Sequence, residues 1–204
     1  MEITTIIFDF GGVLLDWNPR YLYRRVFGND AAMETFLARI GWEEWNLQQD
    51  KGRSLAEGTA LLQRQFPEYH SEIQLFYEQW DKMLKGEIPE NVALLPELKQ
   101  KYKLYGLTNW SAEIFPIVLK SFSFFKLFDG IVVSGEEKLV KPDEKIFRVI
   151  LERYHLDAKS TLFIDDNQKN IDTANGMGFS TIHVTAQNRF ETRASCIGSS
   201  LALD

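Results

Sequence analysis

The sequence predicts an α/β protein with a Rossmann-like, three-layer core of five parallel strands and an inserted all-helical segment. Short apolar runs alternate with helix-length amphipathic segments in the second half of the chain, which is typical of βαβ units and a parallel sheet. One further apolar run, at residues 5–8, is separated from the others by a helical pattern over residues 16–88. Because a lone short strand has no partner for its backbone hydrogen bonds, we expect it to join the later sheet.

The N-terminal region begins with a strand and continues with helices. The run Thr-Ile-Ile-Phe at residues 5–8 is rich in β-branched residues, and Asp9 and the two glycines that follow end it. Ser54 and Glu57 fit a capping box at a helix start. We predict no strand within residues 16–88 and interpret this segment as a helical cap beside the sheet. Two apolar sets in it have the spacing of one helix face: Met33, Phe36, Leu37 and Ile40, and Ile73, Phe76, Trp80 and Met83 or Leu84.

The elements after the insert alternate between helix and strand. Helices are expected at residues 91–102, 112–121, 142–154 and 169–177, and strands at residues 104–107, 131–133, 162–164 and 181–184. The chain therefore divides into an α/β core domain, residues 1–15 and 89–204, and a cap domain, residues 16–88.

The composition of the chain bears on its binding partners and on its cellular location. The 29 acidic residues outnumber the 23 lysines and arginines, and the net charge of -6 argues against binding to nucleic acid. Cys196 is the single cysteine, so no intrachain disulfide forms. No apolar run approaches the roughly 18 residues that a membrane span needs. We expect a cytoplasmic protein that binds no membrane, and the pattern leaves its oligomeric state open.

Candidate site residues follow the predicted strands, at the edge where parallel sheets bind ligands. They are Asp9, Thr108 and Asn109, Ser134 and Gly135 with Lys141 shortly after, and Asp165 and Asp166. Three converging carboxylates repel one another by about 4 kcal/mol per close pair at an effective dielectric constant near 20. A divalent cation or proton uptake has to relieve this repulsion, and a ligand set of oxygens without His or Cys favours Mg²⁺.

The other polar groups at this edge suit a phosphoryl group. The hydroxyl of Thr108, the amide of Asn109 and the ammonium of Lys141 are donors for its equatorial oxygens. Asp9 would then be close enough to attack the phosphorus. The pattern predicts phosphoryl transfer through an aspartyl-phosphate.

Four segments in this order resemble the motifs of the haloacid dehalogenase-like (HAD) superfamily. They are Ile6-Ile7-Phe8-Asp9-Phe10-Gly11-Gly12-Val13-Leu14, Leu107-Thr108-Asn109, Lys141-Pro142 and Phe163-Ile164-Asp165-Asp166-Asn167. The helical insert looks like the type I cap of that superfamily. Within it, the chain is most similar to small bacterial sugar-phosphate phosphatases and to the phosphatase domain of soluble epoxide hydrolase. The resemblance implies hydrolysis of a small phosphorylated metabolite, and we expect a sugar phosphate.

The resemblance also implies roles for the matching residues. Asp9 would be the nucleophile and a Mg²⁺ ligand, Asp166 a second ligand and Asp165 a direct or water-mediated one. The carbonyl of Gly11 would complete the protein's share of the metal site. Thr108, Asn109 and Lys141 would bind the phosphate, and Lys141 would offset its charge during the reaction.

One position departs from the phosphatases of the superfamily. Gly11 stands where most of them carry a second Asp, which protonates the leaving group and later activates water. We assign this proton transfer to Asp16 as a hypothesis, and Arg20 is a candidate contact from the cap to an anionic substrate. We expect Trp42, Trp45 and Trp80 to form core of the cap.

Gly11 leaves two alternatives open. One is a metal-independent 2-haloacid dehalogenase, a class that also lacks the second Asp, although the adjacent carboxylates favour the metal-dependent phosphatase. The other is a catalytically idle domain that binds a metabolite without hydrolysing it.

Overall fold

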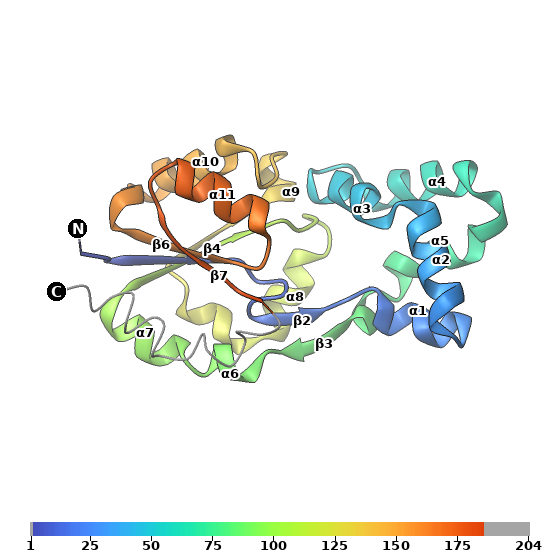
Figure 1. Cartoon of the computed structure of the whole chain (residues 1–204), viewed down its shortest axis with the longest axis horizontal. Helices are drawn as coiled ribbons and strands as arrows, with labels where there is room; N and C mark the ends of the chain where they lie inside the picture. Colours follow the sequence, from blue (N-terminus) through green and yellow to red (C-terminus); the bar gives the residue numbers. More distant parts are fainter. Residues whose placement is uncertain (1, 186–204) are drawn as a thin grey trace.

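A parallel sheet of five strands, in the order β5-β4-β1-β6-β7, forms the centre of the larger part of the molecule (Figure 1). The computed structural model describes residues 2–185, so Cys196 lies outside the described residues. The strands are β1 Thr5–Phe8, β4 Lys103–Thr108, β5 Gly130–Val133, β6 Thr161–Asp165 and β7 Ser180–His183. The first strand joins the later ones as predicted, pairing with β4 on one side and β6 on the other. The α/β fold class with its five-stranded parallel sheet is thus confirmed.

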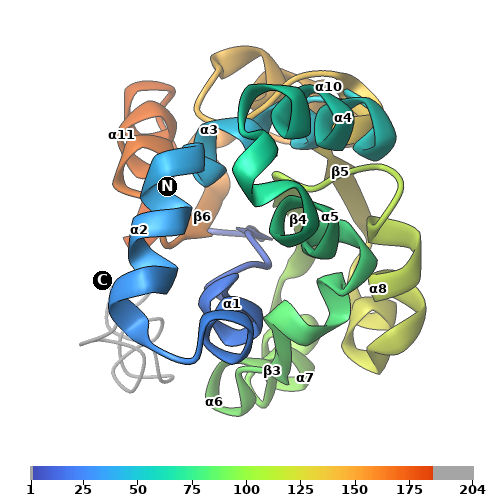
Figure 2. The same ribbon diagram turned by 90° about the vertical axis from the view of Figure 1, so that its right-hand side faces the viewer.

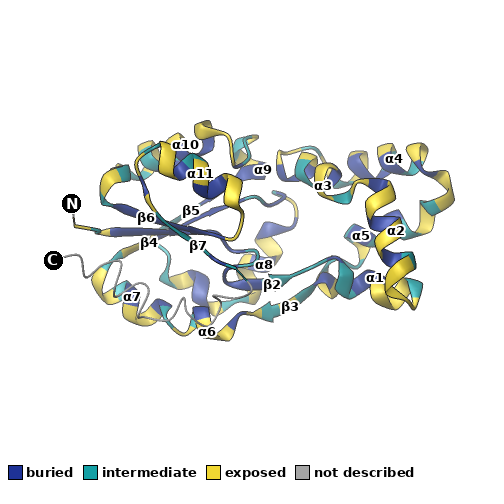
Figure 3. Ribbon diagram, viewed as in Figure 1, coloured by how far each residue is buried: buried dark blue, intermediate teal, exposed yellow. Residues whose placement is uncertain are grey.

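Alternate residues of β1 face two separate hydrophobic clusters, which explains its unbroken apolar run. Ile6 and Phe8 belong to the cluster under α7 and α8, and Ile7 belongs to the cluster under α10 and α11. The helices that cover the sheet are α6 Pro89–Val92, α7 Leu95–Lys101, α8 Phe115–Ser121, α10 Glu144–Tyr154 and α11 Gln168–Gly176. In Figure 3 the sheet and the inner faces of these helices are dark blue, and their outer faces are yellow.

Prolines moved several helix boundaries from their predicted positions. The helix expected over residues 91–102 is two helices, because Pro96 starts α7 at its first turn. Pro116 starts α8 in the same way, three residues later than predicted. Asp143 caps α10 through the amide of Lys145, so this helix begins after the Lys-Pro pair rather than at the proline.

The insert consists of five helices around their own hydrophobic cluster. They are α1 Arg20–Phe27, α2 Asp30–Ile40, α3 Trp42–Asp50, α4 Leu55–Gln65 and α5 His70–Glu78. Figure 2 looks at the molecule from the side of the insert, where α2, α4 and α5 lie in front of the sheet. Trp45 is buried in this cluster and Trp42 packs against it, as expected, and Ser54 caps α4 by accepting a hydrogen bond from Glu57 N at 3.2 Å. Whether the insert is a separate domain stays a prediction.

The prediction that residues 16–88 contain no strand was wrong. Strands β2 Leu15–Trp17 and β3 Leu84–Glu87 pair in an antiparallel ribbon that connects the insert with the sheet (Figure 1). The strands are short, β3 alternates between half-buried and exposed residues, and Gly86 lies within it at φ 126°, so no apolar run marks the ribbon. The apolar set that begins at Ile73 does not lie on one helix. The helix α5 ends at Glu78, and Trp80 begins a short 3₁₀ helix, η2 Trp80–Met83. No helix of residues 2–185 is long and apolar enough to cross a membrane.

Candidate active site

Three carboxylates meet where β1 and β6 end. Asp9 directly follows β1, Asp165 is the last residue of β6, and Asp166 comes next. The register pairs Phe8 with Ile164, which brings the two strand ends level with each other. One oxygen from each of the three carboxylates lies within 4.8 Å of the others. The structure therefore brings together the three acids that the sequence placed at this edge.

Lys141 lies among these acids and is only 2% exposed. Its Nζ is 2.7 Å from Asp165 Oδ2 and 3.1 Å from Asp9 Oδ1, and it donates a hydrogen bond to Leu107 O at 2.8 Å. Burial alone would lower the pKa of Lys141, but the charges of Asp165 and Asp9 outweigh it and raise the pKa above its ordinary value. This side chain is a fixed positive charge between two carboxylates.

Asn109 holds the backbone of Lys141 in place. Its Nδ2 donates to Lys141 O at 3.0 Å, and its Oδ1 accepts from Lys141 N at 2.8 Å. Both polar ends of this amide are therefore engaged with the backbone, and a direct hydrogen bond from Asn109 to phosphate stays a prediction. Thr108 ends β4 and is 1% exposed, next to Asn109 at the same edge.

Asp165 is the most constrained of the three acids. It is fully buried and accepts hydrogen bonds from Lys141 Nζ, from Asn170 Nδ2 at 3.0 Å and from Asn167 N at 2.8 Å. These contacts occupy its carboxylate and fix the loop after β6. Asp165 thus has the surroundings of a residue that positions its neighbours.

Asp166 is exposed, and the backbone of Gly12 lies close to its carboxylate. A Cβ placed on Gly12 would lie 2.1 Å from Asp166 Oδ2, and Gly12 has φ 73°. Glycine is needed at this position both for its left-handed conformation and for space.

The charges of the cluster do not balance. Three carboxylates face one ammonium, and Asp9 Oδ1 is buried without a well-directed hydrogen bond from any residue of the described chain. Burial raises the pKa of Asp9 to about 7; Lys141 opposes this shift, and the charges of Asp165 and Asp166 add to it. An excess of two negative charges, a set of oxygen donors and an unsatisfied buried oxygen fit a divalent cation such as Mg²⁺.

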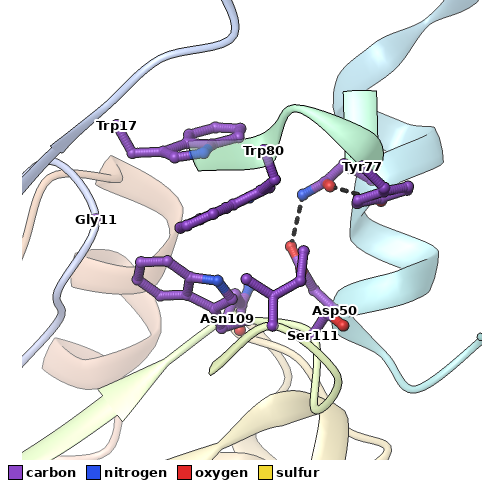
Figure 4. Close-up of a pocket in the computed structure, with 10 residues that line it drawn as sticks. Gly11, Trp17, Asp50, Tyr77, Trp80, Asn109 and Ser111 are labelled. Carbon is purple, nitrogen blue, oxygen red and sulfur yellow. Dashed lines mark hydrogen bonds between the residues drawn. The ribbon is translucent and has the colours of Figure 1, made fainter. Parts of the chain in front are cut away.

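A cavity of about 90 Å³ lies between the insert and this edge of the sheet (Figure 4). Gly11, Asn109, Trp110, Ser111 and Ile114 line it from the core side. The ribbon and the insert contribute Trp17, Asn46, Asp50, Tyr77 and Trp80. Five of these ten residues are aromatic or aliphatic, so the cavity offers an apolar surface beside the charged cluster.

The aromatic part of the lining comes from both sides. Trp80 of the insert packs against Trp110 of the core, with ring centroids 5.6 Å apart. Trp17 lies on β2 of the ribbon that connects the insert with the sheet, and its buried Nε1 has no hydrogen-bond partner among residues 2–185. Trp80 was expected to be core of the cap, and in the structure it also faces the cavity.

Asp50 is an acidic residue of the cavity that sequence reasoning missed. It ends α3, is 9% exposed, and accepts a hydrogen bond from Asn46 Nδ2 at 2.8 Å. Asn46 Oδ1 accepts in turn from the hydroxyl of Tyr77 at 2.9 Å, and dashed lines in Figure 4 mark both bonds. Burial raises the pKa of Asp50 from 3.8 to about 7; the backbone amide of Ser111 opposes the shift by hydrogen bonding, and the charge of Asp9 adds to it.

Two sequence candidates lie elsewhere. Asp16 is on β2, where its Oδ1 accepts a hydrogen bond from the hydroxyl of Tyr21 at 2.8 Å, and it does not line the cavity. Arg20 pairs with Glu34 on the surface of the insert, with Nε 2.5 Å from Oε1. The structure does not bring either residue to the carboxylate cluster.

The insert contacts the core beside Asp50. Ser134 Oγ donates to Asp50 O at 2.5 Å and accepts from Trp110 N at 2.8 Å, so one hydroxyl joins α3 to the ends of β4 and β5. A Cβ on Gly135 would lie 2.4 Å from Ala112 N, which shows how closely the two core loops pack here. These contacts fix the position of Asp50 relative to the sheet edge.

Comparisons with known proteins relate the chain to one family of hydrolases. A family model described as haloacid dehalogenase-like hydrolase matches residues 6–184. A sesquiterpene phosphatase of Aspergillus oryzae is 30% identical over 88% of this chain and 88% of its own length. A phosphorylated carbohydrates phosphatase of Thermotoga maritima is 23% identical over 97% of this chain and 92% of its own length.

A similar solved structure comes from Bacteroides thetaiotaomicron. It is a HAD family enzyme in complex with magnesium and inorganic phosphate. The identity is 28%, the TM-score is 0.70, and the match covers 90% of this chain and 95% of that one.

Proposed function

The chain belongs to the haloacid dehalogenase-like hydrolases, and from this premise we propose that it is a Mg²⁺-dependent phosphatase acting on a small phosphorylated metabolite. The observation that carries the proposal is the cluster of three carboxylates around one buried ammonium, with an excess of two negative charges. The phosphatases among its relatives and the magnesium and phosphate bound by the Bacteroides enzyme support it.

Asp9, Asp166 and the carbonyl of Gly11 would hold the metal. Asp165 would position the site, because Lys141, Asn170 and Asn167 already occupy its carboxylate. When bound, Mg²⁺ would offset the negative charge that the carboxylates and the phosphate bring to this edge of the sheet.

The residues of the chain carry the chemical steps. Asp9 attacks the phosphorus, the bond to the leaving oxygen breaks, and an aspartyl-phosphate forms on Asp9. Lys141, already fixed between Asp9 and Asp165, offsets charge on the equatorial oxygens without having to reorganise. The insert excludes bulk water until one water molecule attacks the intermediate and frees Asp9.

The size and the lining of the cavity bear on the nature of the leaving group. Its volume of about 90 Å³ corresponds to room for about six water molecules at ~15 Å³ each. We propose a sugar phosphate as one substrate class, because Trp17, Trp80 and Trp110 can stack on a sugar ring. The same apolar lining favours a second class, the phosphate of a hydrophobic alcohol, and the Aspergillus relative is a sesquiterpene phosphatase.

A screen of phosphorylated metabolites from both classes, with Mg²⁺ and with EDTA, tests the proposal. We expect phosphate release that requires Mg²⁺, and a loss of at least about 10³-fold in the Asp9→Asn variant. Asp81→Asn is the matched control, because Asp81 is an exposed aspartate of the insert that does not line the cavity. Equal release by the Asp9→Asn variant and the unchanged protein would show that Asp9 is not the nucleophile.

Other outcomes would favour the alternatives. Halide release from a 2-haloacid in EDTA would indicate the metal-independent dehalogenase. Metabolite binding without any phosphate release, measured by calorimetry with the same compounds, would indicate an idle binding domain.

A further inference from the structure

We propose that Asp50, contributed by the insert, is the general acid and base of the reaction. It would take over from the second Asp that most phosphatases of the superfamily carry where this chain has Gly11. This inference rests on the proposed phosphatase function. Asp50 would protonate the leaving oxygen in the first step and accept a proton from water in the second. It replaces Asp16 in that role, since Asp16 faces Tyr21 and lies outside the lining of the cavity.

The position of Asp50 supports the assignment. Its side chain lines the cavity together with Gly11 and Asn109, so a substrate held by the core would meet it from the opposite part of the chain. Asp9 is close enough for its charge to raise the pKa of Asp50. No other carboxylate lines this cavity within residues 2–185.

The surroundings of Asp50 hold its carboxyl in one orientation. Asn46 and the amide of Ser111 donate hydrogen bonds to it, and Tyr77 fixes Asn46 from behind. Gln49 Nε2 donates to the hydroxyl of Tyr77 at 3.0 Å, which extends the chain of hydrogen bonds into the insert. A charged group at an apolar cavity is costly. A side chain with a purely structural role would therefore not need to be an acid at this position.

The protonation state of Asp50 suits both steps. With a pKa of about 7, the carboxyl holds a proton in a large fraction of molecules near neutral pH and can also release it. In the first step Asp9 forms a bond to phosphorus, the leaving oxygen takes the proton of Asp50, and a neutral alcohol departs. In the second step the Asp50 carboxylate takes a proton from water, the oxygen of that water attacks phosphorus, and the bond to Asp9 breaks. Phosphate leaves and Asp50 is again protonated.

A comparison of two leaving groups tests the inference. p-Nitrophenyl phosphate releases a stable anion that needs no proton, whereas benzyl phosphate releases a strongly basic alkoxide. We expect Asp50→Asn to lower kcat/KM for benzyl phosphate by about 10²- to 10⁴-fold and for p-nitrophenyl phosphate by less than about tenfold. With p-nitrophenyl phosphate we also expect a burst of product before a slower steady state, because hydrolysis of the aspartyl-phosphate has lost its base.

Gly11 provides a rescue. No atom lies within 4 Å of a Cβ placed on Gly11, and its φ is not positive, so neither the backbone nor the space around the Cβ opposes Gly11→Asp. In the Asp50→Asn background this second change should restore kcat/KM for benzyl phosphate by more than about tenfold. A general structural defect caused by Asp50→Asn would not be rescued in this way.

The same substitution tests the inference if Asp50→Asn fails to fold. Introduced alone, Gly11→Asp should raise kcat/KM for benzyl phosphate by less than about tenfold, because an acid is already present. A selective gain above about 10²-fold would show that the unchanged site has no acid, which overturns the proposal.

Three further results have fixed meanings. A uniform loss for both substrates in Asp50→Asn overturns the role of Asp50 and leaves the phosphatase function intact. A selective loss for benzyl phosphate in Asp16→Asn, and none in Asp50→Asn, returns the role to Asp16. No Mg²⁺-dependent phosphate release by the unchanged protein overturns the proposed function and this inference with it.

Discussion

Replacing Asp50 by Asn should change how the stability of the protein depends on pH. Below pH 3.8 the Asp50 carboxyl is protonated in both the folded and the unfolded chain, so it has no effect on the free energy of unfolding. As the pH rises, the unfolded chain loses this proton first, while burial keeps it in the folded chain. The folded state therefore loses stability between pH 3.8 and about 7 and then levels off.

The magnitude follows from the size of the shift. A change in pKa from 3.8 to about 7, at about 1.36 kcal/mol per unit, costs the folded state about 4 kcal/mol at full effect. Between pH 5 and pH 8 the expected change is about 2–3 kcal/mol. Asn has no such titration and can still accept the hydrogen bond of Asn46, so the Asp50→Asn variant escapes this loss.

Urea unfolding in EDTA, followed by circular dichroism at several pH values, measures the effect. We expect the free energy of unfolding of Asp50→Asn, relative to that of the unchanged protein, to rise by about 2–3 kcal/mol from pH 5 to pH 8. Asp81→Asn, at an exposed position, should show no such trend. A constant difference for Asp50→Asn across this pH range would refute the reasoning, because it would mean that Asp50 is charged in the folded protein at pH 8 without cost.

Two further predictions concern the carboxylate cluster. Lys141→Met leaves Asp165 buried without its counter-charge and should lower the free energy of unfolding by about 3–5 kcal/mol. Urea titration at neutral pH measures this loss, and an unchanged free energy of unfolding would contradict the ion pair. Gly12→Ala brings a methyl group against the carboxylate of Asp166 and should raise the Mg²⁺ concentration needed for half-maximal activity by more than about tenfold. Gly28→Ala is the control, because Gly28 has a similar φ of 69° and free space around it, and it should leave that concentration unchanged.

The sequence predicted the sheet and the carboxylates well, because both depend on local patterns and topology. The apolar run at residues 5–8 required a buried strand, and parallel strands that lie side by side bring their carboxyl ends to one edge. The sequence alone therefore places Asp9, Asp165 and Asp166 together. The ribbon of β2 and β3 escaped prediction because its strands are short and carry no apolar period.

The cavity residues were harder to predict, because their position depends on how the insert packs. Asp16 lies only five residues after Gly11, which made it the natural substitute in sequence, but the chain turns it towards Tyr21. Asp50 reaches the site through the fold of the insert and through Ser134. The one signal in the sequence was weak: α3 buries Gln49 and Asp50 together with Trp45, so its buried face is partly polar.

The hydrogen bond from Ser134 Oγ to Asp50 O, which joins the insert to the core, has a kinetic consequence for selectivity. On the proposed mechanism, the core binds phosphate whatever is attached to it, but the proton source arrives only with the insert. A phosphorylated compound that prevents the insert from seating beside Ser134 could still occupy the metal site, yet its leaving oxygen would receive no proton. Such compounds would be bound but turned over slowly, and they would compete with good substrates for the site. Discrimination between metabolites would then appear in kcat, with KM values that differ little.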